Sequence, residues 1–503
     1  TNLVNDNILT DGSPSPGGLY SMAYPFNDGT DRYLVSWTPC RLQDPADVNG
    51  TILPCSTENL ANPALVQGPP LFGMFVYNGS DKTQVPVIAP TEGIIYTDIA
   101  AATPKPVAIF IPDKTTTTGL DQTLIDEEVG ILNIRSVYDV DGVDAAPVGI
   151  DVVSDPQLTT ADQRPARFLR IVKAVSIPDD DALDGNRNTS LDNAAYGVST
   201  AQGMREIIGY APIEPDGSVK VKVPANVPLA ISVLDKNGKR ISPRHQNWIQ
   251  VGKGDTLNCV GCHDHASGSP HGRPDGPPSI YAGGTTNGGY FPNTDPAGFD
   301  QELGETMAEA RTRQDMTALD ISVDIKFDDV WTDPMVRAPD TPFSYLYADL
   351  PHVVSGNGSA PVPTSCQTQW QTTFPSCRTV INYEQHIHPI WYEDRGVNTC
   401  TNCHMPSGMD PPAGNTQLDL TDSIDPATNR KLAYEELVAS GVMSPNGALA
   451  SPVFFSIFEA GSGNMVHEGL LTPEELKLIA EWLDIGAQYY NNPFDVDPVR
   501  FIN

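Results

Sequence analysis

A chain of 503 residues exceeds what one hydrophobic core usually supports, so several domains are expected. Its 63 acidic and 30 basic side chains give a formal net charge of -33, which argues against nucleic acid or an anionic membrane surface as a partner. No stretch approaches the ~20 apolar residues of a membrane span, so no span is predicted.

The N-terminal region alternates apolar segments with turn signals. The expected strands include Tyr33 to Trp37, Leu71 to Tyr77 and Val85 to Ile88, with a turn at Asn78-Gly79 before the last of them. We expect a β domain over residues 1–125. The insert between Cys40 and Cys55 then forms a loop that a disulfide would close.

A second β region follows over residues 126–255. Expected strands are Phe168 to Val175, Ile207 to Ile213, Ser218 to Val223 and Leu229 to Leu234. Asp216-Gly217 and Asn237-Gly238 are hairpin turn signals, and the second of these would pair the last strand with Lys239 to Ser242. Short strands joined in this way predict an antiparallel β-sandwich.

Beyond residue 255 the pattern changes to helices separated by long loops. Residues 256–375 contain an expected helix from Asp300 to Arg313, and residues 376–503 contain further helices. The strongest helix begins with Thr472 as N-cap and Pro473 at its first position, and it extends to about Tyr489. Weaker helices are expected at Tyr383 to Tyr392 and Tyr434 to Ser440. The fold class is therefore mixed, mainly β with a C-terminal α-helical part.

A Cys-x-x-Cys-His motif occurs twice in the sequence. The first consists of Cys259, Cys262 and His263, and the second of Cys400, Cys403 and His404. Two thiols one helical turn apart match the two vinyl groups of a haem, and the adjacent histidine can reach the iron. A redox dithiol has no reason to carry the histidine twice, and zinc ribbons space their cysteine pairs more closely. Two covalently bound haems c are therefore predicted.

The other four cysteines form two pairs that are close in sequence, Cys40 with Cys55 and Cys366 with Cys377. Such pairs in polar loops favour disulfides and an oxidising compartment. The chain begins at Thr1 without a basic and apolar leader, as expected of a mature or partial chain. A bacterial protein exported to the periplasm or the cell exterior is expected.

The sequence also offers candidates for the second axial ligand of each haem iron. For the second haem, His467 is favoured because it directly precedes the strong C-terminal helix; His386, His388 and Met465 are alternatives, as is an open site. For the first haem, the candidates are neighbouring or distant histidines, and no choice is made among them: His245, His265, His271 and His352. Of these, His265 lies too close in sequence to His263 to cross to the opposite haem face.

Two acidic loops offer a weaker signal. Asp139 to Asp144 and Asp179 to Asp184 cluster carboxylates as calcium loops do, although neither has the full spacing of an EF-hand. Calcium is thus a further possible cofactor, and ordinary acidic turns are the alternative.

Several segments resemble the hydrazine synthase alpha subunit and related dihaem proteins. These segments are Ile207 to Val223 (IIGYAPIEPDGSVKVKV), Pro224 to Asp235, Gly252 to His263, Tyr383 to His404, and Leu471 to Ala487. The resemblance implies a β-propeller, a middle β domain with the first haem motif, and a C-terminal cytochrome c domain with the second. Residues 1–112 resemble the end of such a propeller, being too short for a whole one.

One departure from that family bears on activity. In the family, a tyrosine four positions after the first motif's histidine is taken to bind the haem iron, and the matching residue here is Ser267. Conventional ligation by His263 is then expected. The leading interpretation is an electron-transfer protein and not an enzyme, working with redox partner proteins or further copies of itself. The alternatives are a haem enzyme with an open first haem, a subunit of an extracellular cytochrome assembly, and a binding module.

Overall fold

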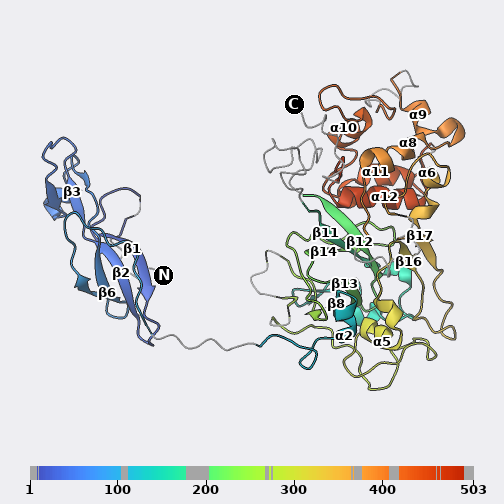
Figure 1. Ribbon diagram of the computed structural model, residues 1–503, viewed down its shortest axis with the longest axis horizontal. Helices are drawn as coiled ribbons and strands as arrows, with labels where there is room; N and C mark the ends of the chain where they lie inside the picture. The colour runs from blue at the N-terminus through green and yellow to red at the C-terminus, as the bar shows by residue number, and fades with distance from the viewer. Residues whose placement is uncertain are drawn as a thin grey trace. The chain divides into compact units, whose positions relative to one another are not determined.

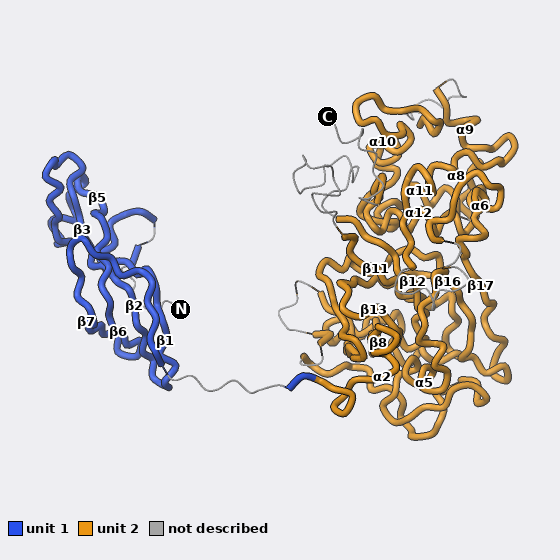
Figure 2. The backbone as a smooth tube through the Cα atoms, viewed as in Figure 1, with its two compact units in different colours: residues 1–113 blue, residues 114–503 orange. Residues whose placement is uncertain are grey.

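The computed structural model describes residues 8–9, 11–103, 112–176, 203–264, 266, 271–273, 276–363, 366, 377–406, 418–459, 461–464 and 466–491. The chain divides into two compact units, Thr1–Asp113 and Lys114–Asn503 (Figure 2). Both candidate haem motifs lie in the second unit. The mainly β character predicted from the sequence is confirmed, with helices concentrated toward the C-terminus (Figure 1).

The first unit is built on a four-stranded antiparallel sheet. Its strands are β1 (Leu19–Pro25), β2 (Arg32–Thr38), β6 (Gly73–Asn78) and β7 (Thr83–Ile88), in that order across the sheet (Figure 1). Alternate side chains on β2 and β6 face the same side, because the side-chain period of a strand is two. Val35 pairs with Phe75 and Tyr33 with Tyr77, and these residues form a small aromatic core together with Trp37.

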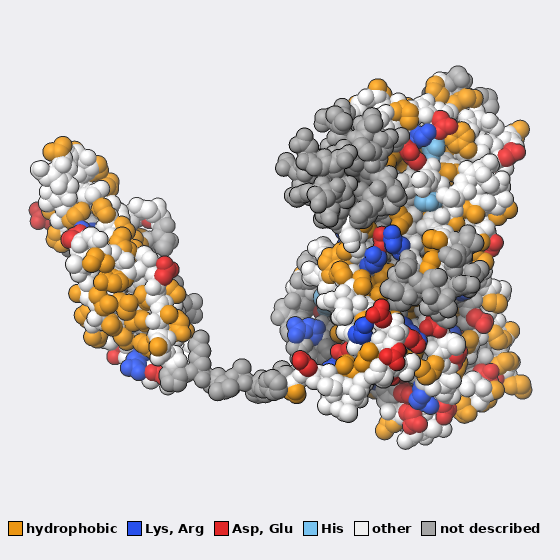
Figure 3. Space-filling view, viewed as in Figure 1, with side chains coloured by type: hydrophobic (Ala, Val, Ile, Leu, Met, Phe, Trp, Pro, Cys, Tyr) orange, Lys and Arg blue, Asp and Glu red, His pale blue; other side chains and the backbone are white. Residues whose placement is uncertain are grey.

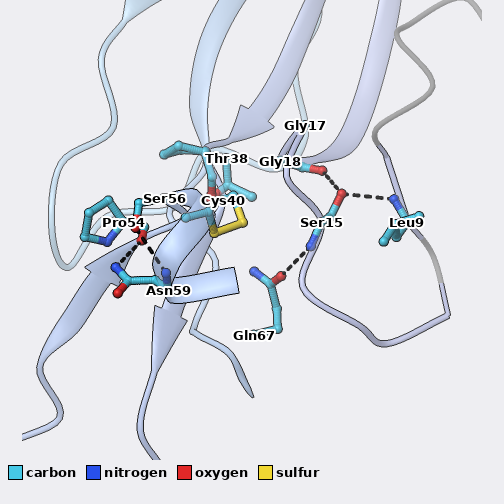
Figure 4. Close-up of a disulfide and its surroundings, with 12 residues drawn as sticks. Leu9, Ser15, Gly17, Gly18, Thr38, Cys40, Pro54, Ser56, Asn59 and Gln67 are labelled. Carbon is cyan, nitrogen blue, oxygen red and sulfur yellow. Dashed lines mark hydrogen bonds between the residues drawn. A yellow bond between two sulfur atoms is a disulfide. The ribbon is translucent and has the colours of Figure 1, made fainter. Parts of the chain in front are cut away.

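The insert between β2 and β6 forms a second, smaller sheet. It contains β3 (Arg41–Gln43), β4 (Ile52–Pro54), helix α1 (Thr57–Leu60) and β5 (Val66–Gln67). The predicted disulfide between Cys40 and Cys55 is present and closes this insert (Figure 4). Close to it, the backbone N–H of Ser15 donates to the side chain of Gln67 (3.1 Å), which ties the segment before β1 to the insert.

The outer strand β7 exposes apolar side chains. Val85 and Val87 are 62% and 55% exposed, and Ile88 is exposed as well. Figure 3 shows hydrophobic side chains covering much of the visible face of residues 1–113. An apolar surface at the edge of a sheet is typical of a sheet that packs against further structure.

The second unit contains two sheets that share one hydrophobic core. One consists of β12 (Arg205–Pro212), β11 (Phe168–Ala174) and β14 (Leu229–Leu234), and the other of β13 (Val219–Pro224), β8 (Val129–Ile134) and β15 (Thr256–Cys259). Inward side chains of both sheets, such as Ile171 and Val221, belong to the same buried cluster. All pairings are antiparallel except that of β15, which runs parallel to β8.

One of the two expected hairpins is formed at its turn, and the other is not. The chain turns at Asp216-Gly217, but β12 pairs with β11 whereas β13 pairs with β8, so this turn carries the chain from one sheet to the other. At Asn237-Gly238 the chain does turn back, and the end of β14 meets residues 239–242 through a bridge between Leu234 and Arg240 and a hydrogen bond from the N–H of Ile241 to the carbonyl of Val233 (2.9 Å), while β14 pairs along its length with β11. At Asp216-Gly217, burial of both strand faces outweighs the local turn preference.

The remaining elements surround this core. In chain order they are α2 (Gln122–Asp126), β9 (Asp139–Val140), β10 (Val143–Asp144), α3 (Ile150–Val153), η1 (Ala161–Gln163), α5 (Met307–Gln314), η3 (Met316–Leu319), β16 (Ile325–Phe327), β17 (Phe343–Tyr345), η4 (Tyr347–Asp349), α6 (Pro351–Val354), η5 (Tyr383–Ile387), α8 (Pro389–Tyr392), η6 (Gly396–Asn398), α9 (Cys400–Cys403), α10 (Leu432–Ala439), η7 (Ala448–Ala450), α11 (Pro452–Phe458) and α12 (Pro473–Asp484). In the parts of the chain described, no helix is long and apolar enough to cross a membrane.

Helix α12 begins as the sequence predicts and then departs from the prediction. Thr472 caps it, and Glu475 completes a capping box. The helix ends at Asp484, before the expected Tyr489, and the structure buries nearly all of it, including four charged residues: Glu475, Lys477, Glu481 and Asp484. A helix buried on all sides must neutralise its charges with partners.

Partners for Asp484 and Glu481 come from the β11–β12 sheet, against which α12 lies (Figure 1), whereas Glu475 pairs with Arg395. Arg170 on β11 donates to Asp484 (2.8 Å), and both side chains are 1% exposed. Tyr210, which pairs with Arg170 in the sheet, donates to Glu481, and Lys477 forms an ion pair with the same carboxylate (2.8 Å). The C-terminal helices and the β sheets are thereby joined by buried polar contacts.

Candidate functional site

The first motif lies where β15 ends beside β9. Cys259 is the last residue of β15, and the backbone N–H of Cys262 donates to the carbonyl of Asp139 (2.7 Å). In return, the N–H of Asp141 donates to the carbonyl of Cys262 (3.1 Å). The first four residues of the motif are therefore clamped between two segments of the β domain, and His263 is exposed beyond them.

A buried aspartate–histidine pair stands behind this motif. Asp139 is fully buried, and its Oδ1 lies 2.9 Å from Nε2 of the buried His271. The other carboxylate oxygen accepts hydrogen bonds from the hydroxyl of Ser279 (2.8 Å) and the N–H of Ile280 (3.0 Å). Since the carboxylate only accepts, His271 donates through Nε2, and its Nδ1 is buried without a hydrogen-bond partner among the described residues.

Another histidine lies within electrostatic range of His263. Burial lowers the pKa of His245, and the charge of His263 lowers it further. His245 is held through its backbone carbonyl, which accepts from the guanidinium of Arg205 (3.3 Å). Of the histidines considered for the first haem, the structure thus brings His245 and His271 to the motif, whereas His265 lies outside the described residues.

The thiols of the motifs do not resemble those of a redox dithiol. Burial raises the pKa of Cys259 to about 11 and that of Cys262 to about 12, and it also raises the pKa of Cys400. A redox dithiol needs a thiolate, which an electropositive environment stabilises. All four motif cysteines stand outside the two disulfides. These features fit thiols that attach a haem covalently.

The second motif begins on helix α9, which places Cys400 and Cys403 one turn apart. The imidazole of His404 lies near that of His467, with 6.1 Å between the ring centroids and 42° between the ring planes. Two imidazoles bound to opposite faces of one metal ion, each by a bond of about 2 Å, have their centroids about 6 Å apart. The side chains present thus fit a haem iron held between two histidines.

The alternative ligands for this haem are engaged differently. The Nδ1 atom of His386 accepts from the N–H of Asn382 (2.8 Å), so its proton sits on Nε2 and that nitrogen has no lone pair for iron. His388 lies 3.2 Å from the carboxylate of Asp422 through Nε2, which favours the same tautomer. Met465 lies outside the described residues.

His352, a candidate ligand for the first haem, lies within electrostatic range of His386, and both of its ring nitrogens are buried without a hydrogen-bond partner among the described residues. It is fully buried on α6, and burial lowers its pKa to about 4; burial, followed by the charge of His352, lowers the pKa of His386 to about 3. Both rings are therefore neutral in the folded protein at pH 7. Nothing in the sequence pattern marked this pair as buried together.

Acid is expected to destabilise the fold through this pair. Because an unfolded histidine has a pKa near 6.5, the unfolded chain binds more protons, and stability is lost as the pH falls below about 6.5 at about 1.4 kcal/mol per pH unit and histidine. Urea unfolding at pH 7.5 and 5.5 measures this loss. A His352→Phe variant should lose less stability over the interval, because it removes one titrating ring. If the two proteins lose equal stability between pH 7.5 and 5.5, His352 is not a neutral histidine that must be protonated on unfolding in acid.

The remaining sites predicted from the sequence are one cysteine pair and two acidic loops. Cys366 and Cys377 form the second predicted disulfide. The carboxylates of the Asp139 to Asp144 loop bind groups of the protein: Asp141 accepts from the N–H of Asp264 (2.8 Å) and Asp144 from that of Ile150 (2.9 Å). The loop at residues 179–184 lies outside the described residues. Among described residues, no cluster of three or more acidic, cysteine or histidine side chains is placed to hold a metal ion.

Comparison with known proteins shows which family the domain around this site is similar to. Residues 166–264, which include the first motif, match the family described as the hydrazine synthase alpha subunit middle domain. The chain is 25% identical over 334 residues to hydrazine synthase subunit alpha of Kuenenia stuttgartiensis, covering 62% of this chain and 35% of that protein. A solved structure of Kuenenia stuttgartiensis hydrazine synthase aligns with 98% of this chain and 56% of its own, with 19% identity and a TM-score of 0.49.

These findings correct the leading interpretation of the sequence. An electron-transfer protein that is not an enzyme was expected, partly because Ser267 replaces a tyrosine, but the domain that carries the first motif matches a domain of an enzyme subunit. Ser267 itself lies outside the described residues. The chain spans about a third of the length of the curated relative. Through its matched middle domain and its relative, this chain is similar to the hydrazine synthase alpha subunit.

Proposed function

We propose that this protein is a haem enzyme in which a small molecule reacts at the first haem, while the second haem transfers electrons. The observation that carries the proposal is the family match of the domain around Cys259, Cys262 and His263. The difference between the two sites supports it. His404 lies near a second imidazole at axial spacing, whereas His263 is exposed and stands near a buried aspartate–histidine pair.

The residues around the first motif have distinct tasks in this proposal. A haem attached at Cys259 and Cys262 would supply an iron that binds and activates small ligands. Asp139 holds His271 by its Nε2–H, which leaves Nδ1 as the atom that can accept a proton. The buried position of both side chains excludes water from this proton acceptor. We do not propose that this protein produces hydrazine.

The second motif would hold its haem differently. Cys400 and Cys403 would provide the covalent bonds, and His404 and His467 the two axial nitrogens. An iron with two histidine ligands has no open position, so this site suits electron transfer to or from the first haem or a partner. His386 and His388 are proposed to support the fold around this motif.

We also propose a domain architecture, a location and an assembly for this chain that resemble those expected for the family. The four-stranded antiparallel sheet of the first unit, with exposed apolar residues on β7, supports a propeller-blade-like domain that packs against further β structure. The helices around residues 376–491 support a cytochrome c-like domain. Two disulfides support export to the periplasm or cell exterior. Because the curated relative is named as a subunit, we propose that this chain also works in an assembly.

Carbon monoxide binding tests the proposal. We expect the reduced protein to bind one carbon monoxide per chain, at the first haem, because the second haem has both axial positions filled. The oxidised protein should show a high-spin and a low-spin signal of equal amount in electron paramagnetic resonance. Two low-spin haems that bind no carbon monoxide would refute an open first site and with it the proposed activity.

A further inference from the structure

We infer that Asn464 is a positioning residue for the second haem: it fixes the tautomer and orientation of His467 and thereby its strength as an axial ligand. This inference rests on the proposed ligation by His467. Asn464 belongs to the segment between α11 and α12, three residues before the histidine, and its Oδ1 lies 3.1 Å from Nδ1 of His467.

The direction of this hydrogen bond follows from the other contacts of Asn464. Its Oδ1 also accepts from the backbone N–H of Val466 and of His467, both at 3.2 Å. Backbone N–H groups only donate, so the amide oxygen, and not the nitrogen, must face them. The same oxygen can then bind Nδ1 of His467 only if Nδ1 carries the proton. The Nε2 atom is consequently left with the lone pair that an iron needs.

The same segment limits how His467 can rotate. The ring of Phe458, at the end of α11, lies edge-on to the imidazole with 5.5 Å between centroids and planes at 84°. The backbone N–H of Glu468 donates to the carbonyl of Asn464 (3.0 Å), which closes the turn that carries the histidine. A side chain held on two sides in this way has lost its rotational freedom before it meets a ligand.

Hydrogen bonds separate His467 from the other histidines near the second motif. In His386, Nδ1 accepts from a backbone N–H, and in His388, Nε2 faces a carboxylate. In both rings the Nε2 atom therefore carries the proton. Among the described histidines of residues 377–491 other than His404, His467 is the one whose local contacts leave Nε2 free. A hydrogen-bond acceptor behind a metal-bound imidazole also raises its basicity, which strengthens the bond and favours the oxidised iron.

The test compares three changes at this position and its neighbour in the full dihaem protein. Asn464→Asp keeps the acceptor and adds charge, so the second haem should stay low-spin with a lower midpoint potential. Asn464→Ala removes the acceptor, so the potential should rise and cyanide should displace His467 from the oxidised haem about 10- to 100-fold faster. Ser462→Asp places a similar charge two residues away without touching the imidazole, and it should lower the potential less.

Two outcomes separate this inference from the ligation on which it rests. If His467→Ala leaves the second haem low-spin, the ligand assignment itself is wrong. If His467→Ala makes that haem high-spin, but Asn464→Ala matches the unmodified protein in both potential and displacement rate, Asn464 has no positioning role. Equal shifts with Asn464→Asp and Ser462→Asp would likewise reduce its effect to charge alone.

Discussion

Replacing Asp484 by alanine is expected to destabilise the second unit by about 3–5 kcal/mol, the range found when one partner of a buried ion pair is removed. The change leaves the guanidinium of Arg170 charged and 1% exposed. It also removes the acceptor for the backbone N–H groups of Arg240 (3.0 Å) and Ala448 (2.9 Å). Urea unfolding followed by circular dichroism measures the loss.

Matched variants separate charge from hydrogen bonding at this position. Asp484→Asn keeps an acceptor oxygen for the two backbone groups, so it should be less destabilising than alanine. Combining Asp484→Leu with Arg170→Leu removes both charges and should recover much of the stability lost by the single change, because an apolar pair avoids the desolvation penalty. If the Asp484→Ala variant is as stable as the unmodified protein, the ion pair between Asp484 and Arg170 does not hold α12 against the β11–β12 sheet.

Replacing both Cys400 and Cys403 by alanine is expected to reduce the haem that stays bound under denaturing conditions from two groups per chain to one. The two thiols are the attachment points at this site, and both stand outside the disulfides. The pyridine haemochrome spectrum, combined with protein quantification, gives the count. The low-spin signal assigned to the second haem should disappear as well, because the iron loses its covalent support.

The corresponding change of Cys259 and Cys262 is the control for this prediction. It should also leave one haem, but it should abolish carbon monoxide binding and spare the low-spin signal. Replacing Cys366 and Cys377 removes a disulfide and should leave two haems, with stability lowered by about 2–4 kcal/mol. Two covalent haems in the Cys400 and Cys403 variant would overturn the assignment of the second motif.

Several elements could be predicted because their signals are local. The N-cap Thr472 and the start of α12 follow from residues that are adjacent in sequence. The strands of the first unit follow from the alternation of apolar residues. By contrast, the turn at Asp216-Gly217 connects different sheets, since burial of β12 and β13 in one core decided their pairing.

In the candidate sites, too, residues with local signals could be predicted, whereas contacts between distant segments could not. His467 was favoured from its place before α12, and the structure sets it near His404. Asn464 was missed, although its distance of three residues from a candidate ligand is a local signal that could have identified it. The contact of Asp139 with His271 joins residues far apart in the chain, and no pattern in the sequence points to it.

The sequence by itself determined the chemistry that depends on spacing: two Cys-x-x-Cys-His motifs and two disulfide pairs, each encoded within a short segment. The tertiary structure decided which groups meet across long separations, namely Asp484 with Arg170 and His404 with His467. Such contacts depend on how buried surfaces pack. Packing decides whether a charged residue such as Lys477 faces water or a carboxylate inside the protein.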